Sequence, residues 1–288
     1  MYKNFFIFIL IIFSLNLNAA TVDTVLIKSV SMDTTYKAAV ILPSSYAGTT
    51  GTYPVVYLLH GAGGHFDSWL TKTPDKNFLK NLADHHEIII VLPEGEVYSW
   101  YLDSQFDKKS QFETHIIKEV VPKIDALYKT VKDRQGRAIS GYSMGGHGAL
   151  YLATRHPEVF CAAGSMSGGV DMNYSKFRFS GDLTRTKQEF QRILGTSDPD
   201  SEAFRDNSVI NMVDEIKKNG LAIIIDCGVD DYLLEVNRAL HERLVYQNVS
   251  HDYTERPGGH TWAYWENAVS YQMLFFEKIF KNRRVSAG

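Results

Sequence analysis

The stretch ISGYSMGGHGAL, residues 139–150, joins a short apolar run to a helix-like run through a turn rich in glycine. Its centre, GYSMG at 141–145, matches the Gly-x-Ser-x-Gly pattern, in which a serine projects from a sharp, strained turn between a strand and a helix. Side chains at Gly141 and Gly145 would collide with such a turn, and the N-terminus of the helix behind it favours negative charge. The pattern predicts Ser143 as a nucleophile; a glycine-rich packing turn with an idle serine is the alternative.

The sequence around this turn supports a strand before it and a helix after it, because strands and helices alternate along most of the chain. Apolar, β-branched runs predict strands at 24–32, 36–43, 54–61, 88–95, 136–141, 159–168, 221–228 and 250–259. Helical spacing of apolar residues predicts helices at 77–86, 112–130, 145–157, 232–248 and 262–281. We expect Pro122 to kink or restart the second helix. The alternation predicts an α/β fold with a mostly parallel sheet, helices on both faces and functional loops at the carboxyl ends of the strands.

One long segment, 170–219, interrupts this alternation. It is polar, contains SGD and GTSDPDS, and has only weak helical patterns. We expect a lid-like insertion over the sheet, placed before the strand at 221–228. Residues 20–288, which include this insertion, are predicted to form a single catalytic domain.

A serine hydroxyl needs a base and an acid that orients the base. A nucleophile turn of this kind takes its acid after a later strand and its histidine after the last strand. His260, in RPGGHTWAYW, lies between the last short strand and the closing helix, and therefore fits the base. The acid comes from DCGVDDYLL, where Asp226 lies inside the strand and Asp230 and Asp231 follow it; either of the latter two could instead cap the next helix.

Backbone N–H groups must also stabilise the oxyanion that forms on the ester carbonyl. One comes from the residue after the nucleophile, here Met144, and a second from the loop after an earlier strand. LLHGAGGHFDSW supplies that loop, with Ala62 as the predicted donor and Gly63 in reserve. The GAGG in it does not fit a nucleotide site, because Phe66 stands where the dinucleotide pattern needs glycine. No metal-binding motif is found, and we expect no cofactor.

Composition and the N-terminal residues indicate the class of protein and where in the cell it acts. With 288 residues, 44% of them hydrophobic, and a net charge of −3, the chain has ordinary globular composition and no basic stripe for nucleic acid. Lys3, the apolar run 5–13 and NLNAAT predict a cleavable export signal over 1–19, and hence a secreted or periplasmic protein without a stable membrane anchor. Cys161 and Cys227 should lie well apart as buried thiols, without a disulfide.

With these motifs in hand, the chain resembles the putative-esterase family of α/β hydrolases, which includes esterase D type, tributyrin, feruloyl and acetyl-xylan esterases and mycolyltransferases. LLHGAGGHFDSW, SWYLDS, GYSMGGHGAL and PGGHTWAYW carry the resemblance, which extends from about 38 to 280. It implies the α/β-hydrolase fold, with Ser143 as nucleophile and His260 as base. The family places its acid before an aromatic or small residue and a leucine, which favours Asp231, before Tyr232, over Asp230.

The resemblance implies a secreted serine carboxylic-ester hydrolase for short acyl or carbohydrate-linked esters. Trp100 and Tyr101, after the strand at 88–95, could stack on a sugar or aromatic acyl group, with core packing as an equal alternative. An acyltransferase would share every site residue. An S-formylglutathione hydrolase fits less well, because that branch is generally cytosolic and carries a serine-glycine-leucine turn where His60-Gly61-Ala62 stands here. A glycan-binding module without activity is disfavoured by the complete serine, acid and histidine set.

Overall fold

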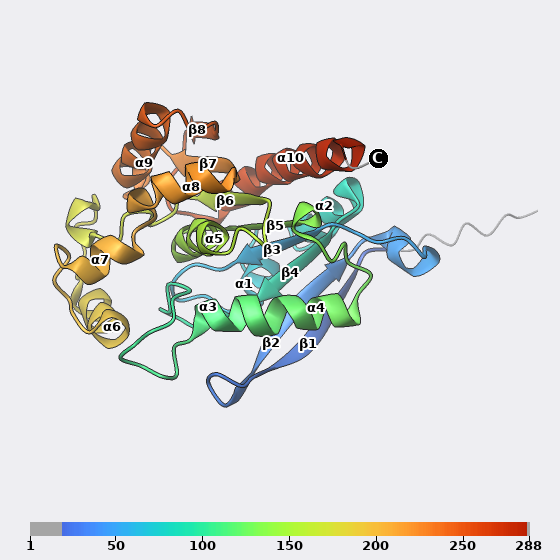
Figure 1. Ribbon diagram of the computed structural model, residues 1–288, viewed down its shortest axis with the longest axis horizontal. Coiled ribbons are helices and arrows are strands. Elements are labelled where there is room, and N and C mark those ends of the chain that lie inside the picture. The colour runs from blue at the N-terminus through green and yellow to red at the C-terminus, as the bar shows by residue number, and fades with distance from the viewer. Residues whose placement is uncertain (1–18, 287–288) are drawn as a thin grey trace, which may run out of the picture.

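The computed structural model describes residues 19–286, and within them one eight-stranded sheet carries helices on both faces (Figure 1). The strands lie in the order β1-β2-β4-β3-β5-β6-β7-β8. Their bounds are Thr21–Ser29 (β1), Thr34–Leu42 (β2), Val55–Leu59 (β3), Ile89–Pro93 (β4), Arg137–Gly141 (β5), Ala162–Met166 (β6), Ala222–Gly228 (β7) and Asp252–Arg256 (β8).

Strand direction places the functional loops together. β2 pairs antiparallel with β1 and with β4, whereas the pairs from β4 through β3, β5, β6 and β7 to β8 are all parallel. Every residue of β3, β4, β5 and β6 is buried, which explains the continuous apolar sequences of β3 and β4. The carboxyl ends of the parallel strands therefore open at one edge of the sheet, where the candidate site residues follow β3, β5, β7 and β8.

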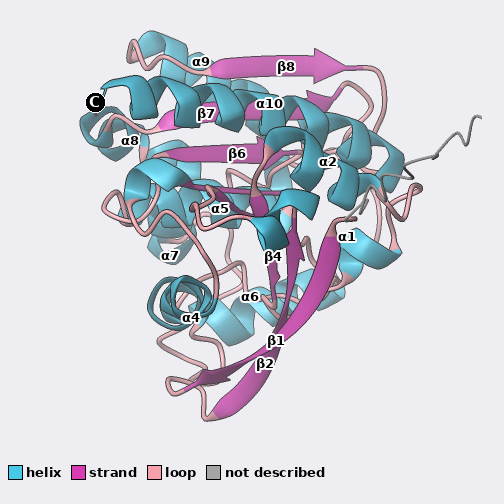
Figure 2. Cartoon of the chain, turned by 90° about the vertical axis from the view of Figure 1, so that its right-hand side faces the viewer, coloured by secondary structure: helices cyan, strands magenta, loops and turns pink. Residues whose placement is uncertain are grey.

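The helices divide between two apolar cores. One face of the sheet packs against α1 (Ser68–Thr71), α2 (Phe78–His86) and α10 (Trp262–Ser286), and α2 and α10 contact each other (Figure 2). The other face carries α4 (Val121–Leu127), α5 (Met144–Arg155), α8 (Val213–Asn219) and α9 (Leu234–Tyr246). The short helical turns are Ser44–Gly48, α3 (Phe112–Thr114), Arg134–Gly136, Tyr174–Lys176 and Val209–Asn211. The structure thus has the predicted layers of a doubly covered parallel sheet.

Of the two outcomes expected at Pro122, a kink or a restart, the structure shows a restart after a wider helical turn. α3 continues into a π-helical segment, His115–Val120, which runs directly into α4. Pro122 lies in the first turn of α4. A proline has no N–H to donate and its ring crowds the carbonyl of the preceding turn, and the π-helical turn upstream gives the room that a regular α-helix lacks.

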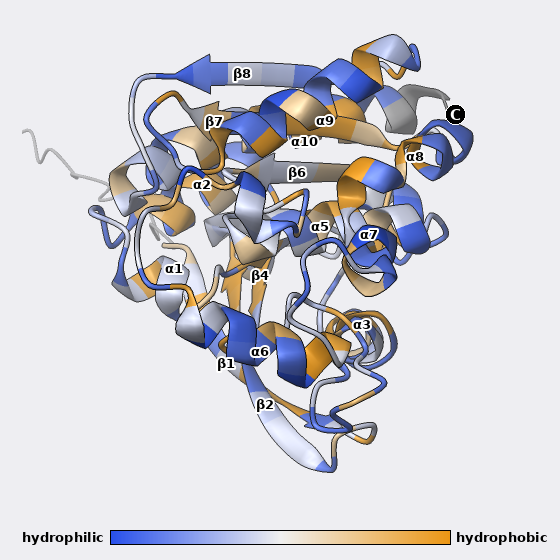
Figure 3. Cartoon of the chain, turned by 90° about the vertical axis from the view of Figure 1, so that its left-hand side faces the viewer, coloured by the Kyte–Doolittle hydropathy of each residue, from blue (hydrophilic) through white to orange (hydrophobic). Residues whose placement is uncertain are grey.

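The segment 170–219 folds onto the α5 face of the sheet. It contains α6 (Thr184–Leu194), α7 (Glu202–Asn207) and α8, and α6 consists mainly of hydrophilic residues, coloured blue in Figure 3. The aromatic side chains of Phe190 and Phe204 nevertheless join the main core. The helices that the sequence predicts only weakly are held by this buried apolar contact.

Two further predictions concern cysteines and membranes. Cys161 and Cys227 are buried and are not joined by a disulfide, as predicted. Among the described residues, no helix has the length and apolarity needed to cross a membrane. Residues 1–18 of the predicted export signal lie outside the described part of the chain.

Candidate active site

The turn between β5 and α5 presents Ser143 at the edge of the sheet. Ser143 has φ 56° and ψ −122°, a backbone conformation that L-residues rarely adopt. A β-carbon on Gly141 would lie 2.5 Å from the backbone of Gly145, and one on Gly145 would lie 2.6 Å from the carbonyl oxygen of His60. The two flanking glycines therefore permit the sharp turn for the steric reason that the motif predicts.

Three side chains from three loops meet at this turn. The Ser143 hydroxyl lies 2.9 Å from Nε2 of His260, to which it can donate. Nδ1 of His260 lies 2.9 Å from Oδ2 and 3.1 Å from Oδ1 of Asp231, where it can donate in turn. The serine follows β5, the acid follows β7 and the histidine follows β8. Residues far apart in sequence thus form one chain of hydrogen bonds.

The three candidate acids separate clearly in the structure. Asp231 is 1% exposed and also accepts a hydrogen bond from the N–H of Leu233 at 2.9 Å, which fixes its carboxylate. Asp230 is exposed, whereas the hydrogen bonds of His260 Nδ1 go to the two carboxylate oxygens of Asp231. Asp226 is bound to Arg256 and to the hydroxyl of Tyr264. Asp231 is therefore the carboxylate that orients the imidazole.

The two backbone donors that the sequence suggests are available at the site. Within residues 19–286, no hydrogen bond to another backbone group occupies the N–H of Ala62 or that of Met144. The N–H of Gly63 already donates to the carbonyl of Val97 at 2.9 Å. The N–H of the reserve donor is thus used to hold the loop, whereas those of Ala62 and Met144 have no such backbone partner in the described chain.

Buried polar contacts hold the loop that carries Ala62. His60 is 1% exposed; its Nδ1 donates to the carbonyl of Gly61 at 2.9 Å, and its Nε2 accepts from the N–H of Gly95 at 2.9 Å. Burial would raise the pKa of Glu94, but contacts with His60 and the N–H of Phe66 lower it to about 2. His60 and Glu94 thus tie the loop after β3 to the end of β4.

Trp100 and Tyr101 lie beside the site as parts of the core. Tyr101 has no exposed surface, and its hydroxyl donates to the carbonyl of His60 at 3.0 Å. Trp100 is 7% exposed and its ring packs against His147 and Phe190. Because residues of α5 and α6 enclose them, neither ring offers a free face to a sugar. Trp100 and Tyr101 therefore match the core-packing alternative.

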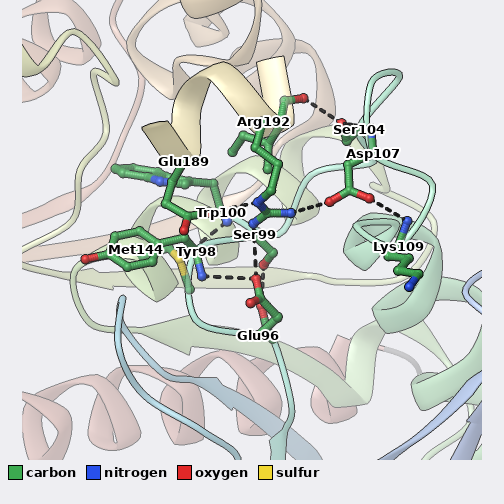
Figure 4. A network of polar contacts seen from close by, with 12 residues as sticks. Glu96, Tyr98, Ser99, Trp100, Ser104, Asp107, Lys109, Met144, Glu189 and Arg192 are labelled. Atoms are coloured by element: carbon green, nitrogen blue, oxygen red, sulfur yellow. Dashed lines mark hydrogen bonds and ion pairs between the residues drawn. The ribbon is translucent and has the colours of Figure 1, made fainter. Parts of the chain in front are cut away.

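The loop after β4 is also tied to the insertion, a connection that the sequence does not reveal. Arg192 of α6 forms ion pairs with Glu189 at 2.8 Å, Asp107 at 2.5 Å and Glu96 at 3.4 Å (Figure 4). Next to this network, the N–H of Trp100 lies 3.3 Å from the sulfur of Met144, the first residue of α5. The ion pairs of Arg192 with Asp107 and Glu96 join residues far apart in sequence, so no sequence pattern could predict them.

Aromatic rings surround the imidazole. The ring of His260 lies 4.5 Å from that of Tyr232 and 4.8 Å from that of Trp265, which itself stacks on Tyr142 at 4.2 Å. Tyr232 is not among the predicted site residues, although its place directly after Asp231 could have suggested a role. These rings fix the position of the histidine from both sides.

Two large cavities lie away from Ser143, His260 and Asp231. Cavities of about 700 and 780 Å³ are lined by residues of the α3, α5 and insertion region and include no residue of the serine, histidine and aspartate set. In the described chain, no group of three or more potential metal-ligating side chains gathers. The hydrogen-bonded geometry, rather than cavity size, therefore marks the candidate site.

Comparison with known proteins agrees with this architecture. The sequence model of the family described as Putative esterase matches residues 29–276. The chain belongs to this esterase family. A solved ferulic acid esterase is 28% identical and superposes with a TM-score of 0.76, over 91% of this chain and 99% of that one. The predicted family and the α/β-hydrolase fold are therefore confirmed.

Two curated members of the esterase family show how far the likeness extends. An esterase of Mycobacterium tuberculosis (strain ATCC 25618 / H37Rv) is 28% identical over 237 residues, which are 77% of this chain and 51% of that protein. An acetyl esterase of Caldicellulosiruptor saccharolyticus is 26% identical over 78% of this chain and 83% of its own length. The chain thus spans about half the length of the mycobacterial relative.

Proposed function

We propose that this chain is a serine carboxylic-ester hydrolase in which Ser143, His260 and Asp231 act together. The observation that carries the proposal is the continuous hydrogen-bond chain of 2.9 Å from Ser143 to His260 and 2.9 Å from His260 to Asp231. A serine so placed on a strained turn, with its base oriented by a buried acid, is arranged for attack on a carbonyl carbon.

The proposed reaction has two halves. Ser143 attacks the ester carbonyl while its proton passes to Nε2 of His260, and the N–H groups of Ala62 and Met144 stabilise the oxyanion. The tetrahedral intermediate collapses, the bond to the alcohol oxygen breaks, and His260 returns the proton to that oxygen. Water, deprotonated by His260, then releases the acid from Ser143. None of these steps uses a cofactor.

Short acyl or carbohydrate-linked esters, of the acetyl and feruloyl kinds, are the proposed substrates. The names of the relatives, an acetyl esterase and a ferulic acid esterase, support this class. The predicted signal at 1–19 supports action outside the cytoplasm, where such esters of plant or microbial polysaccharides occur. An acyltransferase would use the same residues with a sugar in place of water, and product analysis with a sugar acceptor separates the two.

Replacing the nucleophile tests the proposed function directly. Ser143→Ala is expected to lower kcat/KM for p-nitrophenyl acetate by at least roughly 10³-fold, because no other group forms the acyl-enzyme. Asp231→Asn should also lower it by on the order of 10³-fold, while its neighbour variant Asp230→Asn serves as a matched control with nearly full activity. Circular dichroism checks that each variant is folded. Retained activity in folded Ser143→Ala would refute the mechanism.

A further inference from the structure

Tyr232 occupies a position that the proposed mechanism does not yet use. It follows Asp231 directly and precedes α9, and its ring centre lies 4.5 Å from that of His260 at an angle of 42°. The Ser143 side chain is also near enough to its hydroxyl to influence the pKa of the phenol. The phenol therefore borders both the nucleophile and the base.

The insertion holds this phenol in place. The ring of Phe179 lies 5.3 Å and that of Phe177 6.4 Å from the ring of Tyr232, and the N–H of Arg178 donates to the Tyr232 carbonyl at 2.8 Å. Three consecutive residues of the insertion thus contact one tyrosine. Because the ring is held from outside and by His260 from inside, its hydroxyl has little freedom to turn away from the serine.

The hydroxyl is a donor that keeps its proton at neutral pH. Burial, together with the negative charge of Asp231, raises the pKa of Tyr232 to about 12, and the nearby Ser143 side chain opposes that rise. A phenol with this pKa does not act as a proton source in the reaction. It can, however, donate a hydrogen bond to an oxygen that gains negative charge.

The sheet order decides which oxygen that is. Ser143 follows β5; Ala62 follows β3 on one side of it, while Tyr232 follows β7 and His260 follows β8 on the other side. The carbonyl oxygen turns toward the N–H of Ala62, and the alcohol oxygen must face His260, which protonates it. The tyrosine therefore lies on the alcohol side of the ester.

We propose that the hydroxyl of Tyr232 donates a hydrogen bond to the alcohol oxygen of the ester as its bond to the carbonyl carbon breaks. The inference rests on the proposed esterase function and adds a group that stabilises the leaving alcohol. As the carbon–oxygen bond breaks, its electron pair goes to the alcohol oxygen, which takes the proton from Nε2 of His260. Tyr232 donates a hydrogen bond to this oxygen but keeps its own proton throughout.

This arrangement favours esters of sugars and simple alcohols over activated esters. An alkoxide leaving group carries much charge on its oxygen in the transition state and gains from a donor. A p-nitrophenolate spreads the charge over its ring and gains little. Tyr232 is thus a determinant of alcohol specificity.

Tyr232→Phe tests the proposal by comparing two acetates with the same acyl group, p-nitrophenyl acetate and ethyl acetate. The quantity to measure is kcat/KM, which reports the acylation step. The later hydrolysis of the acetyl-enzyme is the same for both substrates. The variant should lose on the order of tenfold more kcat/KM on ethyl acetate than on p-nitrophenyl acetate. Tyr98→Phe is the matched control, because Tyr98 lies near Tyr232 and its ring packs under Arg185. It should leave the ratio of the two rates unchanged.

The alternatives have different signatures. Equal losses on both acetates would mean that Tyr232 only supports the fold or His260, and no loss would mean that its hydroxyl does not reach the ester; either result overturns the proposal. Thermal unfolding of the variant, which keeps the ring, separates a folding defect from a kinetic one. If Tyr232→Phe changes no ratio while Ser143→Ala is inactive, this inference fails alone; an active Ser143→Ala overturns the esterase function itself.

Discussion

Two strained turns meet at the same edge of the sheet and use their strain differently. After β5, Ser143 has a φ of 56°; after β4, Trp100 and Tyr101 have φ values of 54° and 60°. The first turn presents a polar side chain to His260, whereas the second sends two aromatic rings into the core. A positive φ at a non-glycine residue therefore marks a constrained position, and its surroundings decide whether the constraint serves chemistry or packing.

The glycines of the 139–150 stretch divide between these two turns. Gly141 and Gly145 leave room for backbone around Ser143, but a β-carbon on Gly148 would lie 2.4 Å from the ring of Tyr101. Gly148 thus serves the second turn, by accepting an aromatic ring against α5. Glycines of one short sequence therefore leave space both for the backbone of the nucleophile turn and for the ring of Tyr101.

The largest effect within this comparison should come from filling the nucleophile turn. Gly145→Ala places a β-carbon 2.6 Å from the His60 carbonyl, so the loop that carries Ala62 must move. We expect a loss of about 3 kcal/mol of unfolding free energy and a large fall in kcat. Urea unfolding and p-nitrophenyl acetate kinetics measure both. Gly48→Ala, where a β-carbon meets nothing within 4 Å, is the control; wild-type behaviour in Gly145→Ala would contradict the steric argument.

A smaller effect, on stability alone, should follow from a change in the second turn. Tyr101→Phe removes the hydroxyl that donates to the His60 carbonyl and keeps the buried ring. Leaving that carbonyl without its donor should cost roughly 1–2 kcal/mol, while KM should stay within about twofold because the ring has no surface for a substrate. A raised KM with unchanged stability would instead make Tyr101 a substrate contact. The turn after β4 would then serve the site, as the turn after β5 does, rather than packing alone.

The smallest effect should be a pH dependence at His147, which lies between the turns. Its ring packs on Trp100, and its Nε2 donates to the Asn207 carbonyl at 2.8 Å. Burial lowers the pKa of His147 to about 4, against the opposing effect of backbone bonds to Asn207 and Trp100. The unfolded chain takes up the proton near its ordinary value of 6.5, so stability is full above that pH and falls as the pH drops toward 4.

The measurement compares wild type with His147→Gln, which retains a donor for Asn207. Between pH 7.5 and 5.5 the wild type should lose about 1 kcal/mol more unfolding free energy than the variant. Urea unfolding at both pH values gives the difference. The same loss in both proteins would show that His147 accepts a proton in the folded state.

Much of the architecture could be predicted because its signals are local. Buried strands such as β3 and β4 are continuous apolar runs, and α5 begins where the motif turn ends. The restart at Pro122 matches one of the two predicted outcomes, whereas the π-helical turn before it depends on packing and could not be predicted. The helices of 170–219 were underestimated because tertiary burial of Phe190 and Phe204, rather than local propensity, holds them.

The candidate site divides in the same way. The order of serine, acid and histidine along the chain identified Ser143 and His260, and the family resemblance favoured Asp231 over Asp230. The distances among the three residues could not be predicted, because they depend on how three separate loops meet at the sheet edge. Burial of Trp100 and Tyr101 was equally out of reach, since it requires glycines 148 and 169 to leave space for their rings.

The sequence by itself determined the order of strands and helices, the esterase family and a glycine-flanked serine, because these depend on residue type and spacing alone. The tertiary structure decided which aspartate reaches His260, which N–H groups have no other backbone partner, and that the ring of Tyr232 lies against that of His260. The physical reason is that hydrogen bonds and ring contacts act over a few ångströms, between residues that only the sheet order brings together.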